Sequence, residues 1–317
     1  GSGFVGGALI QTLVANGVHV MAIARSSTAE QTVAAHGASP VRCDLHDTEL
    51  LKEAMAGSEV VFHCAALTEL TRPWADFEDV IVEGTRRVLQ AALDSGVRRV
   101  VNVSSEAAMV TGFGSPLVDV DEEVPLPDPD TQAHIFYSRA KNMAELICME
   151  FAPKVHVVTV RPRFIWGLGD TVVMRHLVEQ ATSALGFAWI GGAEYLTSTA
   201  NISNVIHGMV LASESGTSGA AYFISDGEDL TVKEMFTQLF STQGVDASNF
   251  MYLPYPIARF IAWTGLVPDV SAQTMALMAQ QVTVRCTRAH ADLNYSPIVT
   301  VQQGMDEMRV AFDSASQ

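Results

Sequence analysis

Short apolar runs alternate with helical stretches along the first half of the chain, and this alternation limits the possible folds more than any other feature. Several runs are apolar throughout, which indicates strands buried on both faces. Segments with helical periodicity, such as 4–16 and 136–151, separate them. The runs expected to form strands are Val18–Ala24, Pro40–Cys43, Glu59–Cys64, Arg98–Val103 and Val155–Val160. Together they predict a parallel sheet covered by helices on both faces.

The rhythm changes after Pro162. We predict an α/β fold, with a Rossmann-like, doubly wound dinucleotide-binding domain at residues 1–162 and a smaller, mainly α/β substrate-binding lobe at 163–317. A cleft between two such units is a common ligand site. Further helices are expected at 172–185, 205–214, 232–242, 257–264 and 301–312, and a short strand at 221–224.

Composition excludes several classes of protein. Apolar residues make up 48% of the chain and charged residues 17%, which supports a large core. A net charge of −16 argues against partners that need a basic surface, namely nucleic acids and anionic membranes. No stretch approaches the roughly 20 apolar residues of an integral membrane span. The four cysteines are widely spaced without a histidine cluster, so we expect a reduced, cytoplasmic protein with no metal site.

A glycine-rich turn, Gly1-Ser2-Gly3-Phe4-Val5-Gly6, opens the sequence and leads into a helix. Glycines let the backbone turn tightly and bring N–H groups and the positive helix end to a pyrophosphate. We therefore assign Gly1, Gly3, Phe4 and Val5 to a dinucleotide site. Such a turn normally follows a strand, so we expect that the first strand of the sheet is missing from this chain.

The end of the next predicted strand indicates which dinucleotide is used. An acidic residue there would accept hydrogen bonds from a ribose 2′-hydroxyl. The sequence instead has Arg25, followed by Ser26 and Ser27, which suit a 2′-phosphate. Arg25 as a solvated surface residue is the alternative. We expect NADP to be favoured, with NAD as the second choice.

Tyr137 and Lys141 open a predicted helix at four-residue spacing, which places them on one face, one turn apart. A phenol with an ordinary pKa near 10 is a poor acid–base catalyst, and a neighbouring ammonium lowers that pKa. Ser104 and Ser105 follow an upstream strand, at the sheet edge where such folds bind ligands. We predict that Ser105, Tyr137 and Lys141 are catalytic, and that Tyr137 and Lys141 also contact the cofactor.

Taken in order, these motifs resemble the extended short-chain dehydrogenase/reductase superfamily, which includes the NAD-dependent epimerases and dehydratases. The resemblance implies that Asp44 and Leu45 contact adenine, that Cys64, Ala65 and Ala66 line the cofactor, and that Pro162 borders the nicotinamide. The segments that carry it are GSGFVGG, Asp44-Leu45, Phe62–Ala66, Glu83-Gly84-Thr85, Ser104-Ser105, YSRAK, RPRFIWGLGD and Cys286–Pro297.

Within the superfamily, the chain looks most similar to the 3β-hydroxysteroid dehydrogenase branch. Ser105 in SSEAAMV matches the branch's catalytic serine, and Leu253–Ser271 resembles an apolar segment of sterol-acting relatives, although ordinary core explains it equally well. The chain departs from the family at Ile81, where an asparagine usually supports a proton relay. It departs again at Arg25, because steroid-acting relatives often favour NAD.

We therefore expect an NAD(P)-dependent oxidoreductase that interconverts a secondary alcohol and a ketone on an apolar, steroid-like small molecule, with a homodimer as a candidate assembly. Phe164, Trp166 and residues 255–263 should line the pocket. One alternative is a nucleotide-sugar epimerase or dehydratase, for which the basic residues Arg175, Arg259 and Arg285 are few and scattered. The other is a non-catalytic cofactor sensor, suggested only by Ile81.

Overall fold

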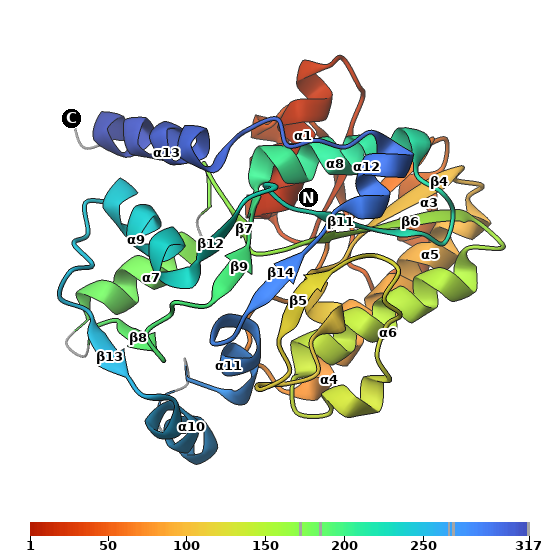
Figure 1. Cartoon of the computed structure of the whole chain (residues 1–317). Helices are drawn as coiled ribbons and strands as arrows, with labels where there is room; N and C mark the ends of the chain where they lie inside the picture. Colours follow the sequence, from red (N-terminus) through yellow and green to blue (C-terminus); the bar gives the residue numbers. More distant parts are fainter. Residues whose placement is uncertain (171–172, 184–185, 266, 268–269, 316–317) are drawn as a thin grey trace.

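The computed structural model describes residues 1–170, 173–183, 186–265, 267 and 270–315 (Figure 1). The first half contains α1 (Phe4–Ala15), β1 (Met21–Ala24), α2 (Ser27–Ala35), β2 (Ser39–Arg42), α3 (Thr48–Met55), β3 (Val60–His63), α4 (Trp74–Phe77), the π-helix η1 (Glu78–Glu83), α5 (Gly84–Asp94), β4 (Arg99–Val103), the 3₁₀-helix η2 (Glu106–Met109), β5 (Leu117–Val120), the 3₁₀-helix η3 (Pro129–Gln132), α6 (Phe136–Phe151) and β6 (His156–Pro162).

The second half is made of shorter elements. It contains β7 (Ile165–Trp166), α7 (Val173–Thr182), β8 (Ala188–Ile190), β9 (Leu196–Ser198), β10 (Ala200–Asn201), α8 (Ile202–Ser215), β11 (Ala221–Ile224), β12 (Asp229–Thr231), α9 (Val232–Thr242), β13 (Met251–Leu253), α10 (Tyr255–Thr264), α11 (Ala272–Met278), β14 (Val282–Val284), α12 (Thr287–Leu293) and α13 (Val301–Ala315). Both ends of the helix expected at 172–185 fall outside the described residues.

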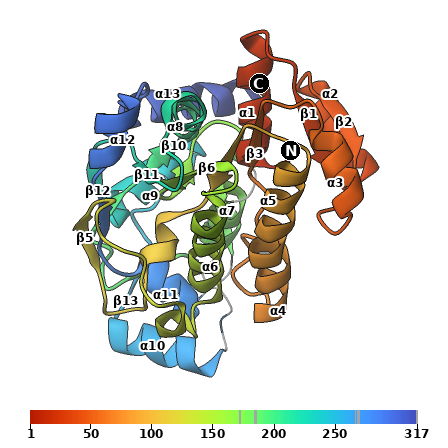
Figure 2. The same ribbon diagram turned by 90° about the vertical axis from the view of Figure 1, so that its right-hand side faces the viewer.

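A parallel sheet in the order β11-β6-β4-β3 forms the centre of the molecule. Helices cover both of its faces: α8 packs on β4 and β6 with α1 beside it, and α5 and α6 pack on the other side (Figures 1 and 2). Val100, Val101 and Val158 are completely buried in this sheet. The predicted α/β fold with parallel strands is confirmed.

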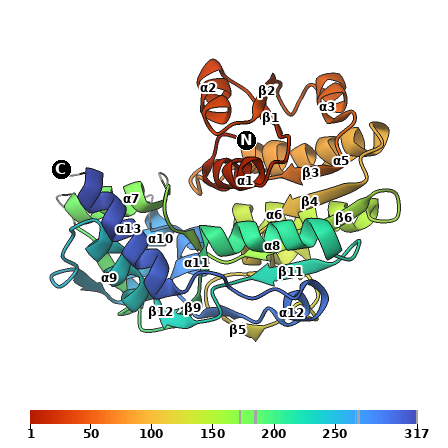
Figure 3. The ribbon, with the colours of Figure 1, turned by 90° about the horizontal axis from the view of Figure 1, so that it is seen from above.

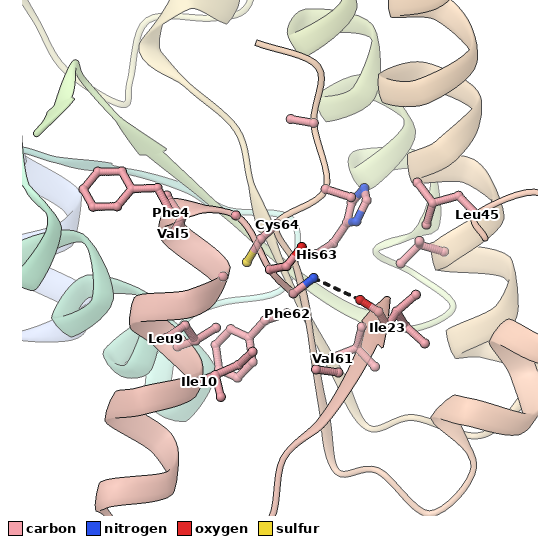
Figure 4. A pocket seen from close by; sticks show the side chains of 18 of the residues that line it. Phe4, Val5, Leu9, Ile10, Ile23, Leu45, Val61, Phe62, His63 and Cys64 are labelled. Atoms are coloured by element: carbon pink, nitrogen blue, oxygen red, sulfur yellow. Dashed lines mark hydrogen bonds between the residues drawn. The ribbon is translucent and has the colours of Figure 1, made fainter. Parts of the chain in front are cut away.

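Strands β1 and β2 form a separate parallel pair, shown at the top of Figure 3. Within the described part of the chain, no strand hydrogen-bonds this pair to β3, the nearest edge of the central sheet. The amino group of Gly1 lies at this interruption and donates a hydrogen bond to the Ile23 carbonyl at 3.1 Å (Figure 4). The missing first strand stays a prediction.

A second sheet, in the order β12-β9-β14-β5, belongs to the lobe beside the central sheet. Next to it, aromatic side chains pack together between α7, α9 and α13, with Phe240 completely buried among them. The division of the chain after Pro162 stays a prediction. However, β11 pairs with β6, and α8 packs on β6, so residues 202–224 extend the central sheet layer although they come from the second half.

The π-helix η1 separates α4 from α5. Ile81 lies in this widened turn and is buried, and its carbonyl accepts a hydrogen bond from Thr85 Oγ1 at 2.6 Å. π-Helical turns are frequent beside functional sites.

None of the described helices has the length and apolar character that crossing a membrane would require.

Candidate active site

A cavity of about 1910 Å³ runs along the carboxyl ends of β1, β3 and β4 and past the start of α1. In Figure 4, Phe4 and Val5 lie at the start of α1, Ile23 and Leu45 lie on the opposite side, and His63 and Cys64 lie between them. Of the residues predicted from the sequence, those that line the cavity are Gly1, Gly3, Phe4, Val5, Arg25, Asp44, Leu45, Cys64, Ala65, Ala66, Ser105, Tyr137 and Pro162. These predicted residues, which are far apart in the sequence, therefore lie around a single cavity.

The start of α1 is suited to a phosphate group. Gly3 is its N-cap and offers no side-chain cap, so the positive helix end is open to a ligand. The turn also requires glycine, because a Cβ atom on Gly6 would lie 2.7 Å from the Gly1 carbonyl oxygen. These residues fit the pyrophosphate of a dinucleotide.

The candidate adenosine end is polar and exposed. Arg25 is exposed on the cavity wall. Ser26 also lines the wall, but its hydroxyl caps α2 by accepting from the Ala29 N–H at 3.1 Å. Ser27 is not among the described lining residues, so the structure offers one nearby hydroxyl instead of the expected two.

His46 is a cavity residue that sequence reasoning missed. Its backbone N–H and Nδ1 both contact Asp44 Oδ1, at 3.0 and 2.5 Å, and its Nε2 contacts Asp79 at 2.9 Å. Hydrogen bonds from His46 lower the pKa of Asp44, with a smaller contribution from the charge of Arg25. The Asp44 carboxylate, expected to contact adenine, is therefore held in place by His46. Only its position two residues after Asp44 could have suggested this partner.

The three candidate catalytic residues come from β4 and α6. Ser105 follows β4 and is the N-cap of η2, where its Oγ accepts from the Ala107 N–H at 3.2 Å. Tyr137 lies in the first turn of α6, and its ring contacts Phe77 with centroids 6.4 Å apart. Lys141 follows one turn later, beneath the described cavity wall instead of on it.

The pKa shifts of Tyr137 and Lys141 differ from the prediction. Burial raises the pKa of Tyr137, the negative charge of Glu106 raises it further, and a hydrogen bond with Ser105 lowers it. Burial lowers the pKa of Lys141 to about 8. The expected lowering of the Tyr137 pKa by Lys141 is therefore wrong for this structure. Burial is the main cause of the raised pKa of Tyr137. Lys141 Nζ donates to the Val103 carbonyl at 2.8 Å and lies 6.0 Å from the centre of the Tyr137 ring.

Two buried ion pairs were also missed, one on the cavity wall and one behind it. Arg163 donates to Glu106 at 2.7 Å, and Arg161 donates to Glu145 at 2.6 Å. Glu145 also accepts from the Ser104 hydroxyl at 2.5 Å, and its charge raises the pKa of Lys141 against the effect of burial. The only sequence signal was an Arg-Pro-Arg triplet directly after an apolar strand, a place where unpaired charges would be costly.

The cavity wall near Ser105 and Tyr137 is mostly apolar. Phe164 lies there, as expected, and residues from distant segments join it: Leu67, Leu70, Leu277 and Met278. Two expectations are corrected. Trp166 is buried and donates to Asp226 at 2.8 Å instead of lining the cavity. Residues 255–263 form α10, whose Tyr255, Pro256 and Arg259 border a separate hollow of about 450 Å³ with Phe113.

Residues 1–255 match the model of the 3-beta hydroxysteroid dehydrogenase/isomerase family. The chain belongs to this family. It is 40% identical over 98% of its length to a 4-hydroxy-2-methyl-3-oxo-4-farnesyl-3,4-dihydroquinoline-1-oxide ketoreductase of Stigmatella aurantiaca, of which it covers 94%. It is 28% identical to a decarboxylating sterol-4-alpha-carboxylate 3-dehydrogenase of Dictyostelium discoideum, with 97% of this chain and 98% of the relative covered.

The fold is shared more widely. A UDP-glucose 4-epimerase of Thermotoga maritima, solved with UDP-glucose, superimposes with a TM-score of 0.78 at 20% identity, over 100% of this chain and 98% of that one. The chain is thus an NAD(P)-dependent dehydrogenase/reductase of the extended short-chain type that acts on a small molecule. Across the described ranges, His, Cys, Asp and Glu side chains form no cluster of three or more that could hold a metal ion.

Proposed function

We propose that this protein reduces a ketone of an apolar small molecule to a secondary alcohol, with NADPH as the favoured cofactor, and that Ser105, Tyr137 and Lys141 are its catalytic residues. One observation carries the proposal: Ser105 and Tyr137 share an apolar-walled cavity with the glycine turn. The activities of two relatives, on a farnesylated ring ketone and on a sterol, support an apolar substrate.

The proposed division of labour follows from the positions of the side chains. The nicotinamide of the bound cofactor supplies a hydride for the carbonyl carbon. Tyr137 donates its phenolic proton to the carbonyl oxygen, so that the C=O π electrons end in an O–H bond. Its raised pKa keeps that proton in place at neutral pH. Lys141 holds the Val103 carbonyl, and so ties α6 to the end of β4.

The positions of the basic residues argue against the epimerase and dehydratase alternative. A nucleotide-sugar diphosphate needs cations, yet Arg175, Arg259 and Arg285 are absent from the described cavity lining. Arg163 does line the cavity beside Phe164, but its charge is paired with Glu106 at 2.7 Å. Arg285 is instead paired with Asp229 at 2.8 Å. The sensor alternative rests on Ile81 alone. The homodimer and the cytoplasmic location stay predictions.

A substrate screen tests the proposal. The protein with NADPH or NADH should turn over ketosteroids or flavonoid-type ketones, because the wall around Phe164, Leu277 and Met278 offers apolar contact and few charges. Cofactor oxidation followed by absorbance is the measurement, with nucleotide sugars as the comparison set. Turnover confined to nucleotide sugars would reject the proposal in favour of the epimerase alternative.

We also infer that the space between β1 and β3 suits one further strand. The facing edges carry no ladder partner among the described strands, and Gly1 already donates to Ile23 as a strand residue would. A chain with four to six apolar, β-branched residues added before Gly1 should melt at a higher temperature and bind NADPH more tightly. Adding a Gly/Ser stretch of equal length is the control. Equal melting temperatures and affinities for both extended chains would contradict the inference.

A further inference from the structure

The side-chain amide of Gln273 on α11 joins two segments of the cavity wall. Gln273 is only 5% exposed. Its Oε1 accepts from the Tyr137 N–H at 2.5 Å, and its Nε2 donates to the Leu70 carbonyl at 2.6 Å. Tyr137 and Leu70 both line the cavity, whereas Gln273 is not among the described lining residues. One buried side chain therefore holds two parts of the wall from behind.

The Tyr137 N–H depends on this distant partner. The first four N–H groups of an α-helix have no acceptor within the helix, and Tyr137 is the second residue of α6. A serine, threonine, aspartate or asparagine before the helix usually satisfies such a group. Here the preceding residue is Ile135, and α6 has no side-chain cap. Gln273, which lies 136 positions further along the chain, supplies the acceptor instead.

The two hydrogen bonds also explain why this position holds an amide. The Tyr137 N–H needs an acceptor and the Leu70 carbonyl needs a donor. A carboxylate can only accept and an ammonium can only donate, whereas an amide does both. Because both partners belong to the backbone, they also fix which way the Gln273 amide faces. A glutamate or a lysine at this position would leave one of the two partners unpaired.

α11 itself is anchored at its other end. The Leu277 carbonyl accepts from Arg163 Nη2, and the Met278 carbonyl accepts from the Tyr195 hydroxyl, both at 2.8 Å. A helix of seven residues is too short to be stable alone, so such tertiary bonds hold it in place. Leu277 also packs in one apolar cluster with Tyr137. The short helix is therefore a fixed support for the first turn of α6.

We infer that Gln273 is a positioning residue that holds the first turn of α6 and the Leu70 segment against α11, and so sets the place of Tyr137 relative to the apolar wall formed by Leu70, Leu277 and Met278. This inference rests on the proposed function, because it specifies how the proposed acid is aligned with an apolar ketone. A ketone in contact with that wall then meets the phenol in a fixed geometry.

Gln273→Met keeps the length of the side chain but removes both hydrogen bonds. We expect kcat for ketone reduction to fall by about 10-fold or more, because a small misplacement of a catalytic group is costly. The dissociation constant for NADPH should change less than about twofold, because uniform cofactor binding does not depend on the place of the acid. Initial rates and the quenching of NADPH fluorescence measure the two effects.

Gln273→Glu separates the two hydrogen bonds. The new carboxylate still accepts from the Tyr137 N–H, at a helix end that favours negative charge, but it cannot donate to Leu70. We expect kcat to stay within about threefold of the unaltered protein, while KM for the ketone rises by about fivefold because the Leu70 part of the wall is released. This split between kcat and KM would not arise from a general loss of stability.

Gln280→Met is the matched control. Gln280 is also buried, and it ties the segment after α11 to another loop, donating to the Gly112 carbonyl at 2.8 Å and accepting from the Gly114 N–H at 2.7 Å. It does not line the described cavity. Its loss should lower the melting temperature as much as Gln273→Met does but leave kcat within about twofold. The inference is overturned if Gln273→Met lowers kcat no further than this control.

Hydrogen exchange at the Tyr137 amide, followed by NMR, tests the same link without a substrate. Exchange should be about fivefold faster or more in Gln273→Met, and little changed in Gln280→Met and Gln273→Glu, because only the first variant removes the acceptor of this N–H. Equal exchange in Gln273→Met and the unaltered protein would also overturn the inference. If the unaltered protein reduces no ketone, the proposed function fails, and the exchange rates still decide whether Gln273 holds Tyr137.

Discussion

Replacing Tyr137 with phenylalanine is expected to lower kcat for ketone reduction by 100-fold or more, because general acids typically contribute about 10²–10⁴-fold. The substitution removes the phenolic proton that Tyr137 presents on the wall it shares with Ser105, while the ring keeps its contact with Phe77. The affinity for NADPH should change little. The fold should survive, since only one oxygen atom is lost.

Steady-state turnover and the quenching of NADPH fluorescence measure the two effects separately. Tyr252→Phe is the matched control, because Tyr252 lies 63% exposed on β13 and does not line the cavity. It should retain full activity. A Tyr137→Phe protein with more than about a tenth of the original kcat would remove Tyr137 from the role of acid.

The pH dependence of the unaltered enzyme should follow from the direction of the Tyr137 shift. Because its pKa is raised, the phenol stays protonated through the neutral range, and reduction should decline only at alkaline pH. Alcohol oxidation requires the deprotonated phenol, so its rate should rise over the same alkaline range. Profiles of kcat in both directions check this expectation.

Replacing Arg25 with aspartate is expected to reverse the cofactor preference. Arg25 is exposed on the cavity wall after β1, where the adenosine ribose is expected. A charge-assisted hydrogen bond contributes roughly 1.5–3 kcal/mol, which corresponds to about one to two orders of magnitude in affinity for the 2′-phosphate. Screening by salt at this exposed edge should reduce the effect. Aspartate would repel that phosphate and accept bonds from the free hydroxyl of NADH.

Dissociation constants for NADPH and NADH, measured for both proteins at two salt concentrations, check this prediction. Arg42→Asp supplies the control, because Arg42 on β2 is exposed and paired with Glu30 but does not line the described cavity. It should leave the preference unchanged. Equal or tighter NADH binding by the unaltered protein would identify Arg25 as an ordinary surface residue.

Local sequence patterns were enough for much of the fold. The bounds predicted for α6, α9 and β11 agree with the structure to the residue. Periodicity defines α6, and a capping box between Thr231 and Glu234 fixes the start of α9. Such signals act within one turn or one strand, so they are readable without knowing what packs against them. Arg25 and Ser105 were predictable for a related reason, because the ends of parallel strands converge at one edge of a sheet. The other strand-end residues of the cavity, Asp44, Leu45, Cys64, Ala65, Ala66 and Pro162, were expected only from the resemblance to a known family.

The sequence by itself therefore determined the α/β sheet, the glycine-rich turn and many of the side chains at the cavity. Only the tertiary structure decided which ion pairs and hydrogen bonds those side chains form and how their pKa values are shifted. Arg163 pairs with Glu106 across 57 positions, and Leu277 reaches the wall from much further along the chain. Lys141 turns to Val103 instead of Tyr137 because burial leaves its ammonium in need of a nearby acceptor. Such contacts depend on which segments burial brings together, and no local periodicity records them.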